Sequence, residues 1–163
     1  MIKIFTTGGT IDKIYFDQKS EFQVGDPQIA QLLVEANITC DYEIESVLRK
    51  DSLDLTDDDR AHIFDKVETD PNRRILITHG TDTMIETARA LLPVRNKTVI
   101  LTGSMQPARL RSSDAIFNIG FAVAAVQLLD AGLHRGGGLR GLGADHDRPL
   151  HVLPQPPLDS GLE

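Results

Sequence analysis

Short apolar runs alternate with longer segments of helical pattern over residues 1–130, and this alternation constrains the fold more than any other feature. The expected strands are residues 2–6, 42–48, 74–78 and 98–102, and the expected helices are residues 28–35, 57–69, 83–92 and 115–129. Such alternation is typical of a parallel sheet with helices on both faces. The sequence therefore predicts a three-layer α/β domain with a mostly parallel sheet over residues 1–130.

Capping residues support these helices. Asp26 is expected to cap the first helix, with Pro27 at its first helical position. Thr56 and Asp114 are expected to cap the second and fourth helices in the same way. Residues 11–25 are polar and end at Gly25, so they are expected to form a loop.

The alternation stops near Leu133. Six glycines lie between residues 132 and 143, and half of the eight prolines lie between residues 149 and 157. Such a composition buries too little apolar surface to offset the entropy lost on ordering. Residues 131–163 are therefore expected to form an irregular, flexible tail without strand or helix.

Two origins of this tail remain open. The codons available for residues 132–136 include a set that, read one nucleotide later, encodes Val-Tyr-Ile-Ala-Val, where a fifth strand is due. The tail is then an out-of-frame extension of a longer ancestral domain. The alternative is a natural flexible tail, and the nucleotide sequence of the gene decides between them.

The composition of the chain argues against several classes of partner and location. The net charge of −7, the aromatic content of 5% and the lack of Trp argue against a nucleic-acid partner. Cys40 is the single cysteine, which excludes an intramolecular disulfide, and no apolar run is long enough to span a bilayer. Met1 leads directly into a strand, which leaves no room for a signal peptide, so a cytoplasmic location is expected. The acidic run at residues 57–59 is expected at a helix start, and no metal or cofactor is expected.

Two threonine-rich turns directly follow expected strands. They are Thr6-Thr7-Gly8-Gly9-Thr10-Ile11 and Thr78-His79-Gly80-Thr81-Asp82-Thr83. In open α/β sheets, ligands bind at the carboxyl ends of the strands. Hydroxyl groups beside glycine N–H groups and a carboxylate favour a hydroxyl nucleophile over a phosphate cradle. The alternative is that these residues only form turns and caps, and His79 in particular is expected to be structural rather than a base.

These turns resemble the two signatures of the bacterial-type L-asparaginase family. The likeness extends over residues 1 to about 130 and places the motifs in order on the expected elements. Its segments are Thr7–Ile11, His79–Met84, the substrate-loop segment Asp51–Thr56, and the later stretch Gly103–Pro107 with Ser113–Ala115 and Phe117-Asn118. The resemblance implies an amidohydrolase that releases ammonia from asparagine through a threonine acyl-enzyme.

The family also implies roles for individual catalytic residues. Thr10 is expected to be the primary nucleophile, and Thr81 and Asp82 are expected to belong to the second catalytic group. A mobile loop after the first motif supplies a tyrosine in the family. Tyr15 is expected to fill this role, and Phe22 is the alternative occupant of that position.

The expected substrate-binding residues come from three loops. Asp82 is expected to contact the α-amino group of the substrate, and Ser52 its α-carboxylate. Gly9 and Gly80 are expected to lie against the substrate. The expected ligand is a small molecule, asparagine or glutamine, with no nucleic-acid or membrane partner.

Three departures from the family remain. Most members have a second, C-terminal domain that completes the site across a dimer, so this chain resembles a short, single-domain variant, and a homo-oligomer is expected. Leu53 stands where many members have a polar substrate-binding residue. The catalytic lysine of the family lies beyond the fifth strand, whereas the last lysine here is Lys97. Three functions therefore stay open: an asparaginase, an amidase for glutamine or amidated tRNA, and a catalytically dead member that acts as a binding module or is a mis-framed product.

Overall fold

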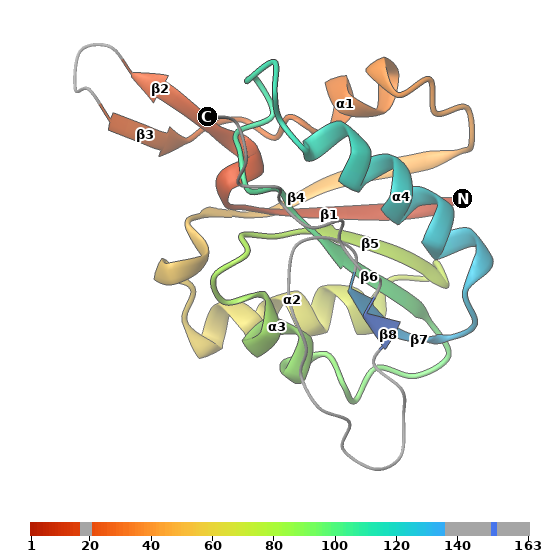
Figure 1. Cartoon of the computed structure of the whole chain (residues 1–163). Helices are drawn as coiled ribbons and strands as arrows, with labels where there is room; N and C mark the ends of the chain where they lie inside the picture. Colours follow the sequence, from red (N-terminus) through yellow and green to blue (C-terminus); the bar gives the residue numbers. More distant parts are fainter. Residues whose placement is uncertain (17–20, 136–150, 153–163) are drawn as a thin grey trace.

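The computed structural model describes residues 1–16, 21–135 and 151–152. In this part of the chain a six-stranded sheet has the order β4-β1-β5-β6-β7-β8, with every neighbouring pair parallel (Figure 1). The sheet strands are β1 (Ile2–Gly8), β4 (Tyr42–Lys50), β5 (Arg74–Thr78), β6 (Thr98–Thr102), β7 (Gly132–Arg135) and β8 (His151–Val152). The helices are α1 (Ile29–Glu35), α2 (Asp57–Thr69), α3 (Met84–Ala90) and α4 (Ala115–Leu128), with 3-10 turns η1 (Thr10–Asp12) and η2 (Ser52–Asp54). The predicted parallel α/β fold is confirmed.

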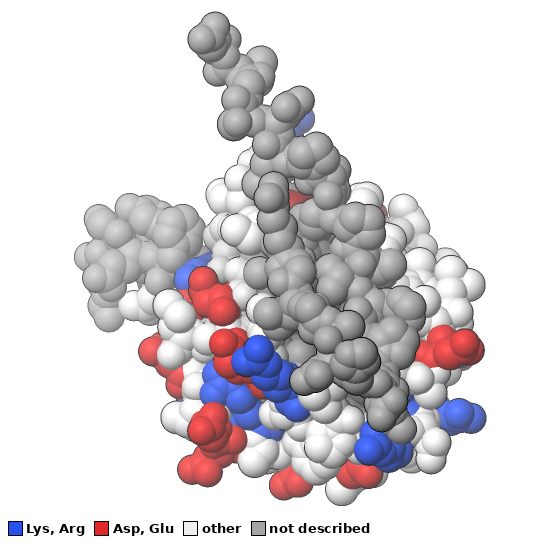
Figure 2. All heavy atoms as spheres, turned by 60° about the horizontal axis from the view of Figure 1, so that its bottom comes forward, with Lys and Arg blue, Asp and Glu red and all other residues white. Residues whose placement is uncertain are grey.

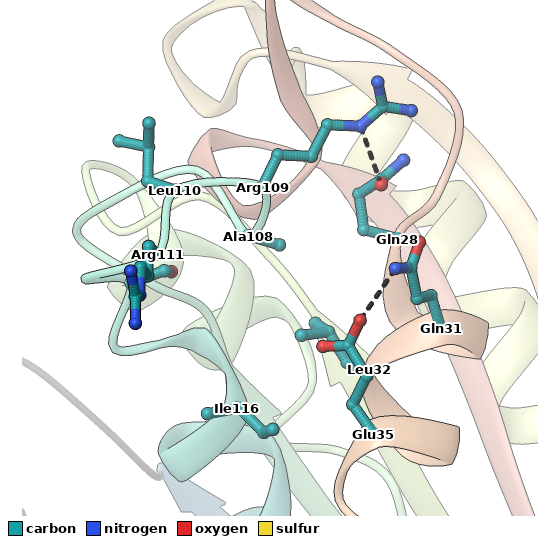
Figure 3. Close-up of a pocket in the computed structure, with 10 residues that line it drawn as sticks. Gln28, Gln31, Leu32, Glu35, Ala108, Arg109, Leu110, Arg111 and Ile116 are labelled. Carbon is teal, nitrogen blue, oxygen red and sulfur yellow. Dashed lines mark hydrogen bonds between the residues drawn. The ribbon is translucent and has the colours of Figure 1, made fainter.

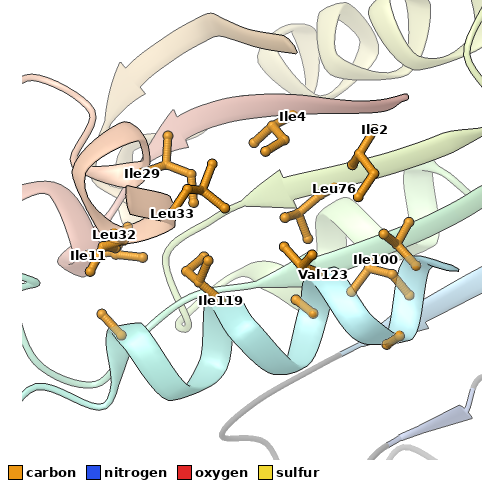
Figure 4. Packing of buried hydrophobic residues seen from close by; sticks show 14 residues of the cluster. Ile2, Ile4, Ile11, Ile29, Leu32, Leu33, Leu76, Ile100, Ile119 and Val123 are labelled. Atoms are coloured by element: carbon orange, nitrogen blue, oxygen red, sulfur yellow. The ribbon is translucent and has the colours of Figure 1, made fainter. Parts of the chain in front are cut away.

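The sheet separates two hydrophobic cores. Helices α1 and α4 cover one face and helices α2 and α3 cover the other (Figure 1). Alternate residues of a strand point to opposite faces, so Ile4 packs with α1 and α4, while its neighbour Phe5 packs with α2 and α3. Figure 4 shows the first of these cores, where Leu76 and Ile100 face Ile119 and Val123 of α4. Burial on both faces explains why the central strands read as continuous apolar runs.

The expectation of a loop over residues 11–25 is wrong. This segment contains η1 and an antiparallel hairpin of β2 (Lys13–Phe16) and β3 (Glu21–Val24). Figure 1 shows the hairpin projecting from the end of the sheet at which β1 finishes. Each strand has only four residues, which is too short for a period to stand out, although both contain residues that favour strands.

Two of the predicted caps are corrected. Helix α1 begins at Ile29 with Gln28 in the capping position, and the N–H of Gln28 donates to Asp12 Oδ1 (2.8 Å) rather than being capped by Asp26. Asp114 precedes α4 as predicted, but its carboxylate accepts hydrogen bonds from the backbone of Met105 and Gln106. The side chains of Asp12 and Asp114 thus accept hydrogen bonds from residues in other segments of the chain. Capping rules that consider only neighbouring residues do not detect such contacts.

The Thr56 cap is confirmed, and it belongs to a charged side of the molecule. Asp59 N donates to Thr56 Oγ1 (3.2 Å), and Thr56 N donates to Asp59 Oδ2 (2.9 Å), which forms a capping box. Lys50 and Lys66 join α2 to β4 through ion pairs with Asp59 and Glu45, each at 2.7 Å. Figure 2 views the molecule from this side and shows acidic and basic side chains interspersed.

The prediction that no strand follows Leu133 is wrong at two points. Residues Gly132–Arg135 pair with β6, and His151–Val152 pair with β7, in parallel. The free edge of β6 offers unpaired backbone groups, and an extended segment can pair there without an alternating side-chain pattern. The rest of the predicted tail lies outside the described residues. No helix in the described ranges is long and apolar enough to cross a membrane.

Three threonines form a row across the ends of the central strands. Thr6 pairs with Thr78, and Thr78 pairs with Thr102, and all three are buried. Their hydroxyl groups find no hydrogen-bond partner among the described residues. A buried hydroxyl without a partner costs free energy, so its removal is expected to be neutral or stabilising.

We therefore expect Thr102→Val to keep the free energy of unfolding unchanged or to raise it by up to about 1 kcal/mol, measured by urea denaturation. Thr98→Val on the same strand is the matched control. The Thr98 hydroxyl donates to the carbonyl of Asp130 (3.1 Å), so its removal is expected to cost about 1 kcal/mol. A greater loss for Thr102→Val than for Thr98→Val would contradict this account of the threonine row.

Candidate active site

The loops that follow β1, β4 and β5 meet at the carboxyl edge of the sheet. Gly9 has φ +90°, and a Cβ atom at this position would lie 2.5 Å from the Cα of Gly80. A Cβ atom on Gly80 would in turn lie 2.6 Å from the Cβ of Ser52. These approaches are closer than any side chain allows, so glycine is required at both positions. The expected substrate-site residues Gly9, Gly80 and Ser52 are thus in direct contact, each from a different loop.

The first turn leaves one threonine hydroxyl available. Thr7 is buried, and its hydroxyl donates to the carbonyl of Thr78 (2.9 Å), which joins the ends of β1 and β5. Thr10 is half-buried at the start of η1, and no hydrogen bond engages its hydroxyl within the described part of the chain. Because Gly9 touches Gly80, Thr10 and Thr81 each lie one residue from the point where the two loops meet.

Hydrogen bonds join the loops that follow β4 and β5. Ser52 Oγ donates to Asp82 Oδ2 over a long 3.5 Å, and Thr83 Oγ1 donates to the carbonyl of Ser52 (2.6 Å). Ser52 is buried, Thr81 is half-buried and the Asp82 residue is exposed. A carboxylate open to solvent and a buried hydroxyl therefore stand side by side at this edge, a pair suited to the two charged ends of an amino acid.

His79 serves as a structural residue. It is fully buried, and burial lowers its pKa, which favours the neutral ring. Its Nδ1 lies 2.7 Å from the carbonyl of Gly80 and therefore carries the proton, so Nε2 accepts from the hydroxyl of Thr87 (2.8 Å). With both ring nitrogens engaged, His79 fixes the loop that carries Thr81 and is not free to act as a base.

Tyr15 lies on the hairpin strand β2, three residues beyond η1. The hairpin register places Tyr15 directly opposite Phe22, the alternative candidate for the same role. The side chains of both residues lie outside the described part of the structure, so their catalytic role stays a prediction.

Asp12 was not identified from the sequence as a site residue. Its side chain accepts from Gln28 N, and its backbone carbonyl accepts from Gly25 N (2.8 Å). Asp12 is only 2% exposed, and this burial raises the pKa of its carboxyl group to about 6. It thereby ties the turn that carries Thr10 to α1 and to the base of the hairpin.

Lys13 is the second residue that the sequence did not reveal. Its ammonium group pairs with Asp51 Oδ2 (2.7 Å), and this bond is the main cause of the lowered pKa of Asp51. Asp51 also accepts from Leu53 N (3.2 Å), which holds η2 and thus Ser52. Lys13 therefore brings a cation to the loops of the site. Among the residues that the structure describes, no three His, Cys, Asp or Glu side chains lie together as a metal ion requires.

We expect the stability of an Asp12→Asn variant to depend on pH in a defined way. The raised pKa means that the folded state favours the protonated carboxyl, so this group's contribution is fully present below about pH 4 and is lost as pH rises through 6. Asparagine keeps the acceptor for Gln28 but does not ionise. At pH 8 the variant should be more stable than the wild type by about 1–3 kcal/mol, and the difference should vanish near pH 4.

Asp59→Asn is the control with the opposite sign. Hydrogen bonds from Lys50 and then from Thr56 lower the pKa of Asp59 to about 2. Its contribution is present above its ordinary pKa and is lost as pH falls through 2, so this variant should be less stable than the wild type at neutral pH. Urea denaturation at a series of pH values measures the free energy of unfolding of both variants and of the wild type. If the free energies of unfolding of Asp12→Asn and the wild type differed by the same amount at every pH, the raised pKa could not belong to Asp12.

Comparison with known proteins shows which family this chain is similar to. The family model "Asparaginase, N-terminal" matches residues 1–134. L-asparaginase 2 of Escherichia coli (strain K12) is 33% identical over 130 residues, which cover 75% of this chain and 37% of that protein. A component of the glutamyl-tRNA(Gln) amidotransferase of Thermoplasma volcanium is 30% identical over 145 residues, which cover 83% of this chain and 36% of that protein.

A solved structure agrees with these matches. The probable cytoplasmic L-asparaginase from Campylobacter jejuni superposes with a TM-score of 0.68 at 30% identity, covering 83% of this chain and 43% of that one. The chain spans less than half the length of the relatives described here. The family model nonetheless matches most of this chain, and its matched part is the N-terminal domain of the family. The chain therefore belongs to the asparaginase family.

Proposed function

We propose that the chain hydrolyses L-asparagine to aspartate and ammonia through a threonine acyl-enzyme. The observation that carries this proposal is the contact of Gly9 with Gly80 and of Gly80 with Ser52. This contact brings the turn of Thr10 against the loop of Thr81 and Asp82. Membership in the asparaginase family supports the reaction class.

The proposed chemistry starts at Thr10. Its Oγ attacks the side-chain amide carbon of asparagine, and the amide nitrogen leaves as ammonia after it gains a proton. Water then cleaves the ester on Thr10 and releases aspartate, so one asparagine and one water give one aspartate and one ammonia. Thr81 and Tyr15 are proposed to assist the proton transfers.

The substrate is proposed to bind through its α-amino acid end. The Asp82 carboxylate holds the α-ammonium group and the Ser52 hydroxyl holds the α-carboxylate, 3.5 Å apart as these side chains stand. If so, Asp82→Asn and Ser52→Ala raise the KM for asparagine more than they lower kcat. Ammonia release measured with asparagine and with glutamine tests this proposal. An unchanged KM in both variants would exclude the assigned binding mode.

A second function is favoured by one specific observation. No lysine follows Lys97, so the family's catalytic lysine has no counterpart at the expected place. The chain would then be a catalytically dead member that binds asparagine without turnover. Calorimetric binding of asparagine with no ammonia release would favour this second function. Strand β7 already stands at the place of the fifth strand, so a version that gains the missing lysine through the shifted frame is expected to raise turnover sharply.

We also propose a homo-oligomer that uses an exposed apolar stripe on α4. Phe117 is 61% exposed and Leu128 is 83% exposed, and the rings of Phe117 and Phe121 stack with centroids 6.3 Å apart. These residues share one side of the helix, since they recur at a spacing of three to four residues or its multiples. Exposed apolar patches of this kind favour association.

The expected result is that Phe117→Glu shifts the protein to a smaller species in sedimentation velocity. Val34→Glu is the matched control, because Val34 is about as exposed (69%) as Phe117 but lies on α1. A wild type that stays monomeric at all concentrations, or equal effects of both variants, would contradict the proposed interface.

A further inference from the structure

A cavity of about 430 Å³ lies between α1 and the loop of residues 105–113. Its size is in the range that small ligands occupy. Figure 3 shows amide and acidic side chains of α1 along one side, with Leu110 and Arg111 of the loop along the other. The lining residues on which the argument depends are Gln28, Leu32, Glu35, Ala108, Arg109 and Arg111.

The charges of this cavity lie on opposite walls and are not paired with one another. Arg109 Nε donates to Gln28 Oε1 (3.1 Å), and Glu35 accepts from Gln31 (2.7 Å). Among the described residues, neither Arg109 nor Arg111 forms an ion pair with a carboxylate, and Glu35 forms none with a cation. Figure 3 shows the Arg109 side chain turned toward Gln28 and away from Arg111. Arg111 is therefore the guanidinium group on the loop wall that suits a carboxylate, and Glu35 on the opposite wall suits an ammonium group.

Both walls of the cavity are tied to the turn that carries Thr10. On the helix wall, Gln28 N donates to the Asp12 carboxylate (2.8 Å). On the loop wall, Ala108 N donates to the carbonyl of Ile11 (3.1 Å). A ligand that draws the two walls together therefore acts, through one hydrogen bond on each side, on the residues directly after Thr10.

We propose that this cavity is a regulatory site for a small carboxylic acid that also carries an amino group. The carboxylate lies at Arg111, the amino group at Glu35, and the carbon chain on the apolar floor formed by Leu32 and Ala108. Occupancy steadies η1 and so the position of Thr10. The kinetic consequence rests on the proposed function, whereas ligand binding and the steadying of η1 do not.

Calorimetric titration with L-aspartate, succinate and succinamide tests the ligand class. The expected order of affinity is aspartate, then succinate, then the uncharged succinamide. Arg111→Gln should weaken aspartate and succinate by at least about tenfold, which is about 1.4 kcal/mol. Glu35→Gln should make the affinities for aspartate and succinate equal. Equal binding of succinate and succinamide, or no saturable binding of any of them, would overturn the proposal.

Two controls locate the binding. Arg89→Gln removes an exposed arginine on the opposite face of the sheet and should leave the affinity unchanged. Asp82→Asn alters the candidate active site and should also leave succinate binding unchanged. Loss of succinate binding in Asp82→Asn with retention in Arg111→Gln would place the ligand in the active site instead and refute the cavity.

Amide hydrogen exchange tests the coupling without any need for turnover. Asp12 N donates to Gly9 O (3.1 Å), and Ala108 N donates to Ile11 O, so both amides report on the Thr10 turn. Succinate is expected to slow exchange at both amides severalfold in the wild type and to have no effect in Arg111→Gln. Unchanged exchange at saturating succinate would refute the coupling.

Discussion

Thr10→Val is expected to lower the proposed ammonia release from asparagine to the background rate, a loss of about 10³-fold or more, while the protein stays folded. Valine keeps the shape of threonine but has no oxygen to form the acyl-enzyme. The half-buried position of Thr10 leaves its hydroxyl available, whereas the neighbouring Thr7 hydroxyl is bound to Thr78. Steady-state ammonia release and circular dichroism separate the loss of chemistry from the loss of fold.

Thr102→Val is the matched control for this result. It makes the same substitution at a buried hydroxyl that has no partner among the described residues. Its turnover should stay within a few-fold of the wild type. Thr81→Val is expected to lose most activity as well, because Thr81 is assigned to the second catalytic group. Wild-type turnover in folded Thr10→Val would eliminate the proposed nucleophile.

Gly9→Ala is expected to cost about 3 kcal/mol or more of unfolding free energy. The new methyl group would lie 2.5 Å from the Cα of Gly80, and φ +90° is strained for any L side chain. Relief requires the β1 and β5 loops to separate, which dismantles the proposed site. Urea denaturation measures the loss.

Gly120→Ala is the control for this effect. Gly120 lies in α4, and a Cβ atom there would meet nothing within 4 Å. Alanine favours helix over glycine, so a gain of about 0.5–1 kcal/mol is expected. If Gly9→Ala were as stable as Gly120→Ala, the close contact between the two loops would not exist in solution.

The sequence predicts the central part of this fold well because the signals there are local. Strands β5 and β6 are buried on both faces and therefore read as short apolar runs that end in threonine. The parallel arrangement places their carboxyl ends at one edge, so the Thr10 and Thr81 turns could be expected together. The Thr56 capping box joins residues only three positions apart and is equally local.

The parts that the sequence did not predict depend on contacts between distant segments. The Asp12 carboxylate caps a helix 16 residues further along the chain, so the cap at Gln28 is invisible to local patterns. Strand β7 forms because β6 offers a free edge, and not because Gly132–Arg135 has a strand pattern. The ion pair of Lys13 with Asp51 joins a hairpin to a remote loop for the same reason.

Release of ¹⁵N-ammonia from asparagine labelled at its side-chain nitrogen tests the central claim most directly. The purified wild type and Thr10→Val are compared at equal concentration, with folding checked in the same samples. The account predicts labelled ammonia above background from the wild type and none above background from Thr10→Val. No release from the folded wild type, or equal release from both proteins, would contradict it.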